Sequence, residues 1–303
     1  GRNSNERGDE GPLRIVIVSY GPYDNNSAIH ITGLANALTQ LGHKVVVSAM
    51  GSPISAGDFG LPRFWCVEHR QLIERPEILR KHFAGVGNES PDLVHCWTPR
   101  QSARTVTRSV VARYDCPYIV HLEDNEVAVG QSFEGVGSGE RDNNKVVGTD
   151  SPAHLMQEFI SGAAGATIIV DALRTLLPFG LTFHLLEPGV DSNRFAPGLD
   201  PAERSRLCEA LGVPDDAWIT VYPGNIHSSN VDDMFSLYTA IHALNARGFK
   251  VHLIRTGVDS PPITDPALAT LSRRYVTNMG FIRRESLAEL LKLADCLVQP
   301  GGP

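Results

Sequence analysis

The run HLEDNE, residues 121–126, contains one histidine and three carboxylates. It lies at the end of a short apolar stretch at residues 118–122. Glu123, Asp124 and Glu126 supply hard oxygen ligands of the kind that a divalent metal ion prefers. His121 closes the apolar stretch, where a structural, hydrogen-bonded histidine would also fit. No HxxxH or HExxH spacing occurs in the chain, which argues against a zinc site.

A second polar group, residues 24–27, lies between an apolar run at 14–20 and a helical pattern. The first run is β-branched and nearly continuous, as in a strand of a parallel sheet that is covered on both faces. Asn25, Asn26 and Ser27 are candidate N-caps for the helix that follows. The free N–H groups of that helix point toward the carboxyl end of the strand, where open α/β sheets bind their ligands.

The stretch 185–230 divides the chain. Pro188, Gly189, Pro197 and Gly198 interrupt regular structure and indicate a hinge. After the hinge, the strand expected at 219–223 leads into a loop that begins at Gly224 and reads GNIHSSN. This loop is of a size to hold a phosphate group. The hinge and the new start after it predict two α/β domains with a cleft between them.

Strands and helices alternate on both sides of this hinge. Strands are also expected at 93–95, 118–122, 166–170, 250–255, 276–279 and 296–299, and helices at 201–211, 231–247, 266–275 and 286–294. Ser286 and Glu289 have the spacing of a capping box at the last helix. The Gly-rich span 127–150 shows no periodicity and is interpreted either as a mobile loop at the cleft or as a surface insertion.

Composition sets the broad class of the protein. The chain has 303 residues, 42% hydrophobic and 20% charged, as in a soluble globular protein. A net charge of -7 argues against a nucleic-acid partner that needs a broad basic surface. The five scattered cysteines are expected to be reduced thiols in a cytoplasmic protein. Residues 1–13 are expected to form a disordered tail, and no run is apolar for long enough to span a membrane.

Four segments of the chain resemble the group 1 (family 4) glycosyltransferases of the GT-B fold in their order and spacing. These segments are LANALTQLGHKVVV, LLEPGVDSNRFAPG, VYPGNIHSSN and VTNMGFIRRESLAELLKLADCLVQP. The similarity covers most of residues 14–300. It implies two Rossmann-like domains that face each other across a cleft, an acceptor-side domain at 14–183 and a nucleotide-sugar domain at 184–303. Because the chain stops at Gly301, Gly302 and Pro303, the second domain is expected to be incomplete.

The resemblance also implies a function. It predicts a retaining, metal-independent transfer of a sugar from a nucleotide-diphosphate sugar to a hydroxyl acceptor, which is a saccharide or a lipid-linked compound. No cofactor is expected. His121 matches the histidine that the family places near the transferred sugar, and Glu123, Asp124 and Glu126 are expected to bind acceptor hydroxyls.

The same resemblance implies a set of donor-binding residues. At some of these positions the chain has a different residue from the one in the family. Where the family has an Arg and a Lys for the leaving diphosphate, this chain has Asn225 and Asn230, so His227 is the nearest candidate for a replacement cation. The family's diphosphate-binding Gly pair corresponds to the bulkier Asn25, Asn26 and Ser27. The full expected donor set is Asn25, Asn26, Ser27, Gly224, Asn225, His227, Asn230, Gly257, Gly280, Phe281, Ile282 and Arg283.

Alternatives stay open at this point. The missing cations favour a catalytically degenerate GT-B relative that acts as a binding or partner subunit. A metal-dependent GT-A transferase would instead use the three acids as metal ligands, and a nicotinamide enzyme is disfavoured because no G-x-G-x-x-G follows the first strand. Arg100, Arg104 and Arg108 share one helix face, which is either solvated or in contact with anionic lipid headgroups at the inner membrane face.

Overall fold

The computed structural model describes residues 11–23, 25–51, 62–84, 89–126, 153–192, 194–227, 230–260 and 266–300. The chain divides into two compact units, Gly1–Val190 and Asp191–Pro303. Most of the expected tail, residues 1–10, and the whole Gly-rich span lie outside the described residues. Within those residues, no helix is both long enough and apolar enough to cross a bilayer.

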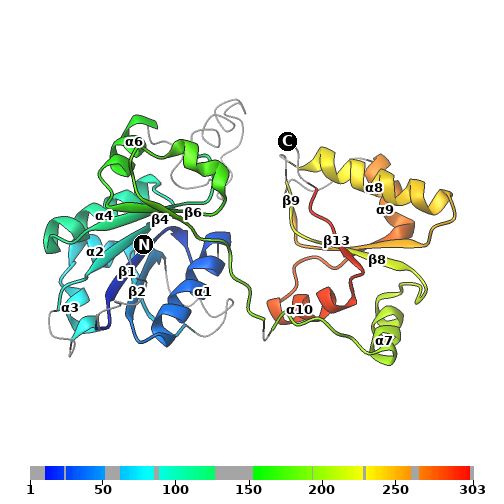
Figure 1. The fold of residues 1–303 in the computed structure, drawn as a ribbon. Helices are drawn as coiled ribbons and strands as arrows, with labels where there is room; N and C mark the ends of the chain where they lie inside the picture. Colours follow the sequence, from blue (N-terminus) through cyan, green and yellow to red (C-terminus); the bar gives the residue numbers. More distant parts are fainter. Residues whose placement is uncertain are drawn as a thin grey trace, which may run out of the picture. The chain divides into compact units, whose positions relative to one another are not determined.

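The described residues of the first unit form a seven-stranded parallel sheet in the order β3-β2-β1-β4-β5-β6-β7 (Figure 1). Central strand β1 is buried along almost its whole length, as its apolar sequence predicts. The strands are β1 (Arg14–Pro22), β2 (Lys44–Met50), β3 (Trp65–Glu68), β4 (Leu93–Trp97), β5 (Tyr118–Leu122), β6 (Gly165–Ile168) and β7 (Phe183–Leu185).

Helices cover both faces of this sheet because successive side chains of each strand point to opposite sides. Ile15 and Ile17 of β1 pack in one cluster with Ile31 of α1, whereas Val16 and Val18 pack in another with residues of α2, α3, α4 and α6 (Figure 1). The helices are α1 (Asn26–Gln40), α2 (His69–Glu74), α3 (Ile78–Phe83), α4 (Gln101–Tyr114), α6 (Ala153–Ser161) and the 3-10 helix η2 (Asp171–Leu176).

The described part of the second unit contains a four-stranded parallel sheet in the order β12-β10-β8-β13, and β9 pairs separately with β11. Ile219 and Val221 pack against α7 and α10, and Tyr222 and Leu253 pack against α8. The strands are β8 (Trp218–Pro223), β9 (Ile226–His227), β10 (Val251–Thr256), β11 (Asp259–Ser260), β12 (Val276–Asn278) and β13 (Cys296–Leu297). The helices are α7 (Pro201–Leu211), α8 (Val231–Ala246), α9 (Pro266–Tyr275) and α10 (Arg284–Leu293).

N-capping residues explain where α7 begins but do not explain where α10 begins. Asp200 caps α7 by accepting a hydrogen bond from the Glu203 N–H at 2.9 Å. The expected capping box at Ser286 is wrong, because α10 begins at Arg284 after the extended residue Arg283 and Ser286 lies inside its first turn. The structure therefore starts this helix before the Ser-x-x-Glu pattern.

Two strands of the first sheet escaped the sequence analysis. Strand β3 pairs with β2, and β7 pairs with β6. Because β7 (Phe183–Leu185) belongs to the first sheet, the first unit continues to Val190, beyond the boundary expected after residue 183. Both strands are short and lie at the sheet edges, where no long apolar run is needed to cover them.

Candidate functional site

Glu123 is the centre of a polar cluster at the carboxyl end of β5. Its Oε2 atom accepts hydrogen bonds from the Ser27 hydroxyl and, at 3.3 Å, from the Thr98 hydroxyl. Its Oε1 atom lies 3.3 Å from Nδ1 of His30. Ser27 and His30 belong to the first turns of α1, so the helix and two neighbouring strand ends meet at one carboxylate.

The charge of Glu123 follows from these contacts. Burial by itself would raise its pKa, but hydrogen bonds from His30 and Ser27 and the influence of Trp97 and His121 lower the pKa overall. Glu123 is therefore an ionised carboxylate at neutral pH. It faces the amino end of α1, where the helix dipole favours a negative charge.

His121 lies beside this carboxylate and is 1% exposed. Its ring is stacked on Trp97 with the centroids 3.9 Å apart, and its Nδ1 atom lies 2.8 Å from the Thr167 hydroxyl. Burial lowers the pKa of His121 to about 4 against the opposing attraction of Glu123, so the ring is neutral at pH 7. Its Nε2 atom is buried and has no hydrogen-bond partner among the described residues. A buried polar nitrogen without a partner is uncommon in a folded protein, which marks His121 as a candidate site residue.

Backbone strain accompanies the cluster. Thr98 has a φ of 58°, which is rare for a β-branched residue. This conformation lets its N–H donate to the carbonyl of His121 at 3.0 Å while its hydroxyl reaches Glu123. Thr98 therefore ties the end of β4 to both candidate site residues.

The loop before α1 behaves differently from the expected phosphate loop. Asn25 caps the helix, because its Oδ1 atom accepts from the Ala28 N–H at 2.7 Å. Its amide nitrogen lies over Gly21, where an added Cβ would be only 2.3 Å away. Asn26 is exposed, and Ser27 is turned toward Glu123. The anion at this helix end is thus supplied by the protein itself.

The expected arginine face of α4 is wrong. Arg100 is 7% exposed and makes a bidentate ion pair with Glu126, with Nε and Nη2 at 2.7 and 2.9 Å from its two oxygens. Arg104 is also buried and donates to the Pro99 carbonyl at 2.8 Å. Only Arg108 of the three is exposed. The three arginines therefore form neither a solvated stripe nor a surface for lipid headgroups.

The three acids of HLEDNE do not converge. Glu123 faces α1, Glu126 pairs with Arg100, and Asp124 has a raised pKa because of burial and the nearby charge of Glu123. The described residues contain no group of three or more His, Cys, Asp or Glu side chains placed to hold a metal ion. The divalent-metal interpretation of these acids is not supported by their geometry.

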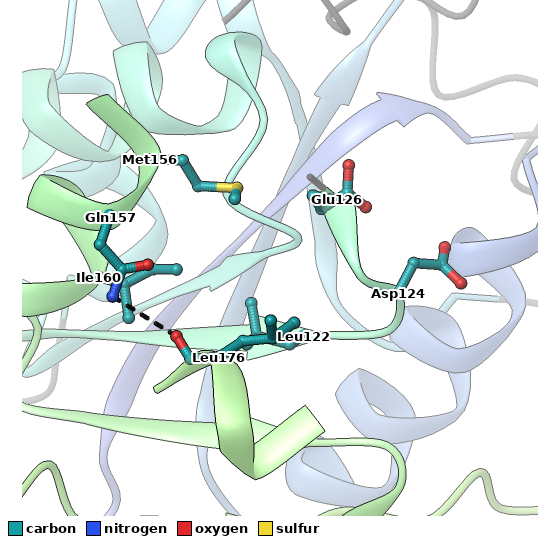
Figure 2. Close-up of a pocket in the computed structure, with 7 residues that line it drawn as sticks. All are labelled: Leu122, Asp124, Glu126, Met156, Gln157, Ile160 and Leu176. Atoms are coloured by element: carbon teal, nitrogen blue, oxygen red, sulfur yellow. Dashed lines mark hydrogen bonds between the residues drawn. The ribbon is translucent and has the colours of Figure 1, made fainter. Parts of the chain in front are cut away.

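Two hollows lie in the first unit outside this cluster. Asp124 and Glu126 line one side of a cavity of about 20 Å³ whose other side is formed by Met156, Gln157 and Ile160 (Figure 2). This volume holds about one water molecule. A groove of about 400 Å³ lies between α4 and α6 beside Tyr118, at the start of β5. It lies at the amino ends of the strands, opposite to the usual ligand position of an α/β sheet.

In the second unit, the loop after β8 is held by its own asparagines. Asn230 accepts from the His227 N–H at 2.9 Å and donates to the Tyr222 hydroxyl and the Asn225 carbonyl, each at 3.1 Å. Asn225 accepts from the Val258 N–H at 2.9 Å. The Asn230 amide is therefore engaged inside the loop, while Asn225 and His227 are exposed.

Two expected donor residues, Gly224 and Gly257, are in close backbone contact. Gly257 has a φ of 90°, and a Cβ there would lie 2.6 Å from the Gly224 carbonyl oxygen. The Gly257 N–H donates to the carbonyl of Gly280 at 2.8 Å. The structure thus brings these three glycines together at the carboxyl ends of β8, β10 and β12.

The remaining expected donor residues follow Gly280. The ring of Phe281 is 78% exposed, and Ile282 packs against the core between β8 and α10. Arg283 is exposed at the start of α10. Of these three, Phe281 and Arg283 offer side chains to solvent.

Arg255 was missed by the sequence analysis. It is 1% exposed near the end of β10, where it forms an ion pair with Asp259, and its Nη1 atom has no hydrogen-bond partner among the described residues. Its charge acts on Tyr222, near the end of β8, and on Tyr238, in the middle of α8. A lone arginine inside the apolar run VHLIRTG was the available sequence signal. His30, Trp97, Thr98 and Thr167 carried no such signal.

No protein-family model matches this chain, and no curated protein matches it significantly. The structure of a glycosyltransferase from Rickettsia africae ESF-5 has a TM-score of 0.63 at 14% identity, over 95% of this chain and 72% of that chain. HepE from Anabaena, solved in complex with UDP and glucose, has a TM-score of 0.66 at 13% identity, over 94% of this chain and 73% of that chain.

A different enzyme class shares the fold as well. A putative UDP-N-acetylglucosamine 2-epimerase from Listeria monocytogenes has a TM-score of 0.53 at 13% identity, over 95% of this chain and 74% of that chain. These similarities confirm the predicted fold class, an α/β chain with two Rossmann-like units of the GT-B type. One fold supports several reactions, so the fold by itself does not identify the reaction.

Proposed function

We propose that this protein is a glycosyltransferase that moves a sugar from a nucleotide-diphosphate sugar to a hydroxyl acceptor, with retention at the anomeric carbon and without a metal ion. The observation that carries the proposal is the buried, unpartnered Nε2 atom of His121 beside the ionised carboxylate of Glu123. The order of the sequence motifs further favours group 1 (family 4). HepE, a protein of similar fold, was solved with UDP and glucose, which supports the choice of a nucleotide-sugar ligand.

The first unit is proposed to bind sugar hydroxyls. Glu123 is ionised and accepts hydrogen bonds, and His121 is neutral because burial lowers its pKa to about 4. Hydroxyl groups satisfy such acceptors, whereas a phosphate beside Glu123 would meet like charge at close range. The contacts of Ser27 and His30 with Glu123 support the proposal of a sugar at this position, with the diphosphate bound elsewhere.

The second unit is proposed to bind the nucleotide diphosphate. Gly224 and Gly257 let the backbones at the carboxyl ends of β8 and β10 pack closely against each other, and the diphosphate is proposed to lie at this end of the sheet. Exposed Asn225 and His227 lie at the same end, ahead of α8. Arg255 is proposed to supply the positive field that Asn225 and Asn230 lack, because its guanidinium is desolvated and only partly paired.

The proposed transfer has a simple balance of bonds. The bond between the anomeric carbon and the phosphate oxygen breaks, and its electron pair stays on the nucleoside diphosphate. The acceptor oxygen bonds to the anomeric carbon on the same face, and its proton passes to the leaving phosphate oxygen. The protein has to position both partners and stabilise the charge that develops on the diphosphate.

The test is direct incubation of the protein with nucleotide-diphosphate sugars and simple saccharide acceptors, with and without a chelator. Release of nucleoside diphosphate, matched by formation of a glycoside with unchanged anomeric configuration, supports the proposal. Glu123→Gln should reduce this activity, whereas replacement of the exposed Arg108 by Gln should not. Neither binding nor nucleotide release with any donor would contradict it.

One observation favours a second candidate, a catalytically degenerate binding or partner subunit. The amide of Asn230 is engaged in the loop, and neither Asn225 nor Asn230 brings a positive charge. Calorimetry with UDP separates the candidates: a native affinity in the micromolar range excludes a degenerate donor site. A large gain in affinity for the Asn225→Arg, Asn230→Lys double variant over a native protein that does not bind UDP would support degeneracy.

A further inference from the structure

Thr167 connects two buried histidines on the face of the first sheet that α1 covers. It faces His121 in the register of β5 and β6. Its hydroxyl oxygen lies 2.8 Å from Nδ1 of His121 and 3.1 Å from Nε2 of His95. One hydroxyl group thus forms hydrogen bonds with both imidazoles.

The tautomers of the two histidine rings depend on each other, because both rings share the single proton of Thr167. Burial lowers the pKa of His121 to about 4 and, with repulsion from His121, that of His95 to about 3, so both rings are neutral at pH 7. A neutral imidazole has one N–H donor and one acceptor nitrogen, and a hydroxyl group has a single proton. Thr167 can donate to only one ring and has to accept from the other. The tautomers of His95 and His121 are therefore linked.

The unpartnered Nε2 atom of His121 decides between the two arrangements. A buried N–H group without an acceptor is rarer and costlier than a buried acceptor without a donor. In the favoured arrangement His121 donates from Nδ1 to Thr167 and Thr167 donates to Nε2 of His95. The His95 proton then lies on Nδ1, which, unlike Nε2 of His121, is not among the fully buried side-chain atoms of the described residues that lack a partner. Stacking on Trp97 holds the ring plane, so Nε2 presents a lone pair in a defined direction.

We propose that Thr167 is a positioning residue that fixes His121 as the Nδ1–H tautomer, so that Nε2 accepts a hydrogen bond from a ligand hydroxyl. The identity of that ligand as a sugar rests on the proposed function, but the tautomer does not. An acceptor at this point selects a neutral hydroxyl and rejects a phosphate oxygen. Glu123 lies nearby as a second, ionised acceptor, so a ligand with more than one hydroxyl fits this position best.

The experiment is ¹⁵N NMR of the full chain labelled at histidine, at pH 7, for the native protein, Thr167→Ser and Thr167→Val. His121 should show a protonated Nδ1 and an unprotonated Nε2 in the native protein and in Thr167→Ser, which keeps the hydroxyl. Thr167→Val, similar in shape, should lose this preference. The signals of His69, which bonds to Ser48 and Ser19, should stay unchanged and report an intact fold.

Two results would overturn the inference: a protonated Nε2 in the native His121, or an unchanged tautomer in folded Thr167→Val. His95→Phe gives a second route if the valine variant does not fold. It removes the group that accepts the Thr167 proton, so the preference of His121 should weaken, and an unchanged preference counts against the proposal.

A kinetic measurement separates this inference from the proposed function. If the native protein transfers a sugar, Thr167→Val should raise KM for the nucleotide sugar roughly tenfold, the effect of about one hydrogen bond, and Thr167→Ser should restore it. If the native protein transfers no sugar, the proposed function fails. The NMR result then still decides whether Thr167 sets the tautomer.

Discussion

The rings of Trp97 and His121 are stacked with their centroids 3.9 Å apart and their planes tilted by 31°. The two residues face each other in the parallel register of β4 and β5. Both side chains are at most 2% exposed, so the indole packs against the imidazole without intervening solvent. Trp97 thereby supports the candidate site through packing, next to the hydrogen bond that His121 makes with Thr167.

Replacement of Trp97 should separate packing from stacking. Trp97→Ala leaves a large buried cavity and should lower the free energy of unfolding by about 3 to 5 kcal/mol. Trp97→Phe keeps an aromatic ring against His121 and should cost distinctly less. Urea denaturation followed by circular dichroism measures both. Equal losses for the two variants would show that the stack itself contributes nothing.

Arg100 should be essential for stability, whereas Arg108 should not. Removing Arg100 leaves Glu126 as an unpaired buried carboxylate, so Arg100→Gln should cost about 3 to 5 kcal/mol. Arg108 is exposed, and Arg108→Gln should change stability by about 0.5 kcal/mol or less. Thermal unfolding of both variants is the measurement. Similar midpoints would contradict the buried ion pair and restore the idea of a solvated helix face.

Gly257 should tolerate alanine less well than a glycine with the same backbone angle. Gly257 and Gly248 have φ of 90° and 89°, but only at Gly257 would a Cβ meet other atoms, 2.6 Å from the Gly224 carbonyl. Gly248→Ala should cost about 1 kcal/mol from its backbone angle, and Gly257→Ala about 3 kcal/mol, because a clash is added. Denaturant titration compares the two directly. An equal cost would mean that the loop relaxes freely.

Stability should fall when the pH drops below about 6.5. Burial lowers the pKa of His69 to about 4, so between the two values the unfolded chain binds a proton that the folded chain does not. The contribution of neutral His69 to the free energy of unfolding is complete above the pKa of His69 in the unfolded chain. It is lost, up to roughly 3 kcal/mol, as the pH falls toward the pKa of His69 in the folded chain. His69→Gln should make this part of the curve of unfolding free energy against pH less steep, while buried His95 and His121 continue to contribute to it. An unchanged slope in the variant would exclude His69 as a source.

Arg255 should affect the binding of phosphate groups more than that of the nucleoside. Arg255→Met should weaken UDP binding roughly ten- to hundredfold, the range for a bond to a charged group, and should leave uridine binding nearly unchanged. Arg255→Lys should retain part of the affinity, and replacement of the exposed Arg247 by Gln serves as a control. Calorimetry with both ligands gives the ratio. Equal losses for UDP and uridine would assign Arg255 a purely structural role in its pair with Asp259.

Local patterns predicted most of the fold. Apolar runs such as 14–20 and 118–122 became central parallel strands, since a strand covered on both faces needs an uninterrupted apolar sequence. The alternation of strands and helices around the hinge predicted an α/β chain with two Rossmann-like units, which the structure and its GT-B neighbours confirm. Short edge strands such as β3 and β7 depend on pairing with a neighbour and carry no comparable pattern.

The sequence by itself determined which residue types are present, the hydrophobic pattern of each element and the position of His121 and Glu123 at the end of a strand. Only the tertiary structure decided their partners: Ser27 and His30 for Glu123, Trp97 and Thr167 for His121, and burial for Arg100 and Arg255. Charge state and hydrogen bonding depend on which groups from distant segments replace water around a side chain. The order of the strands and the packing of the helices decide which groups surround a side chain. The spacing of residues along the sequence does not specify these groups.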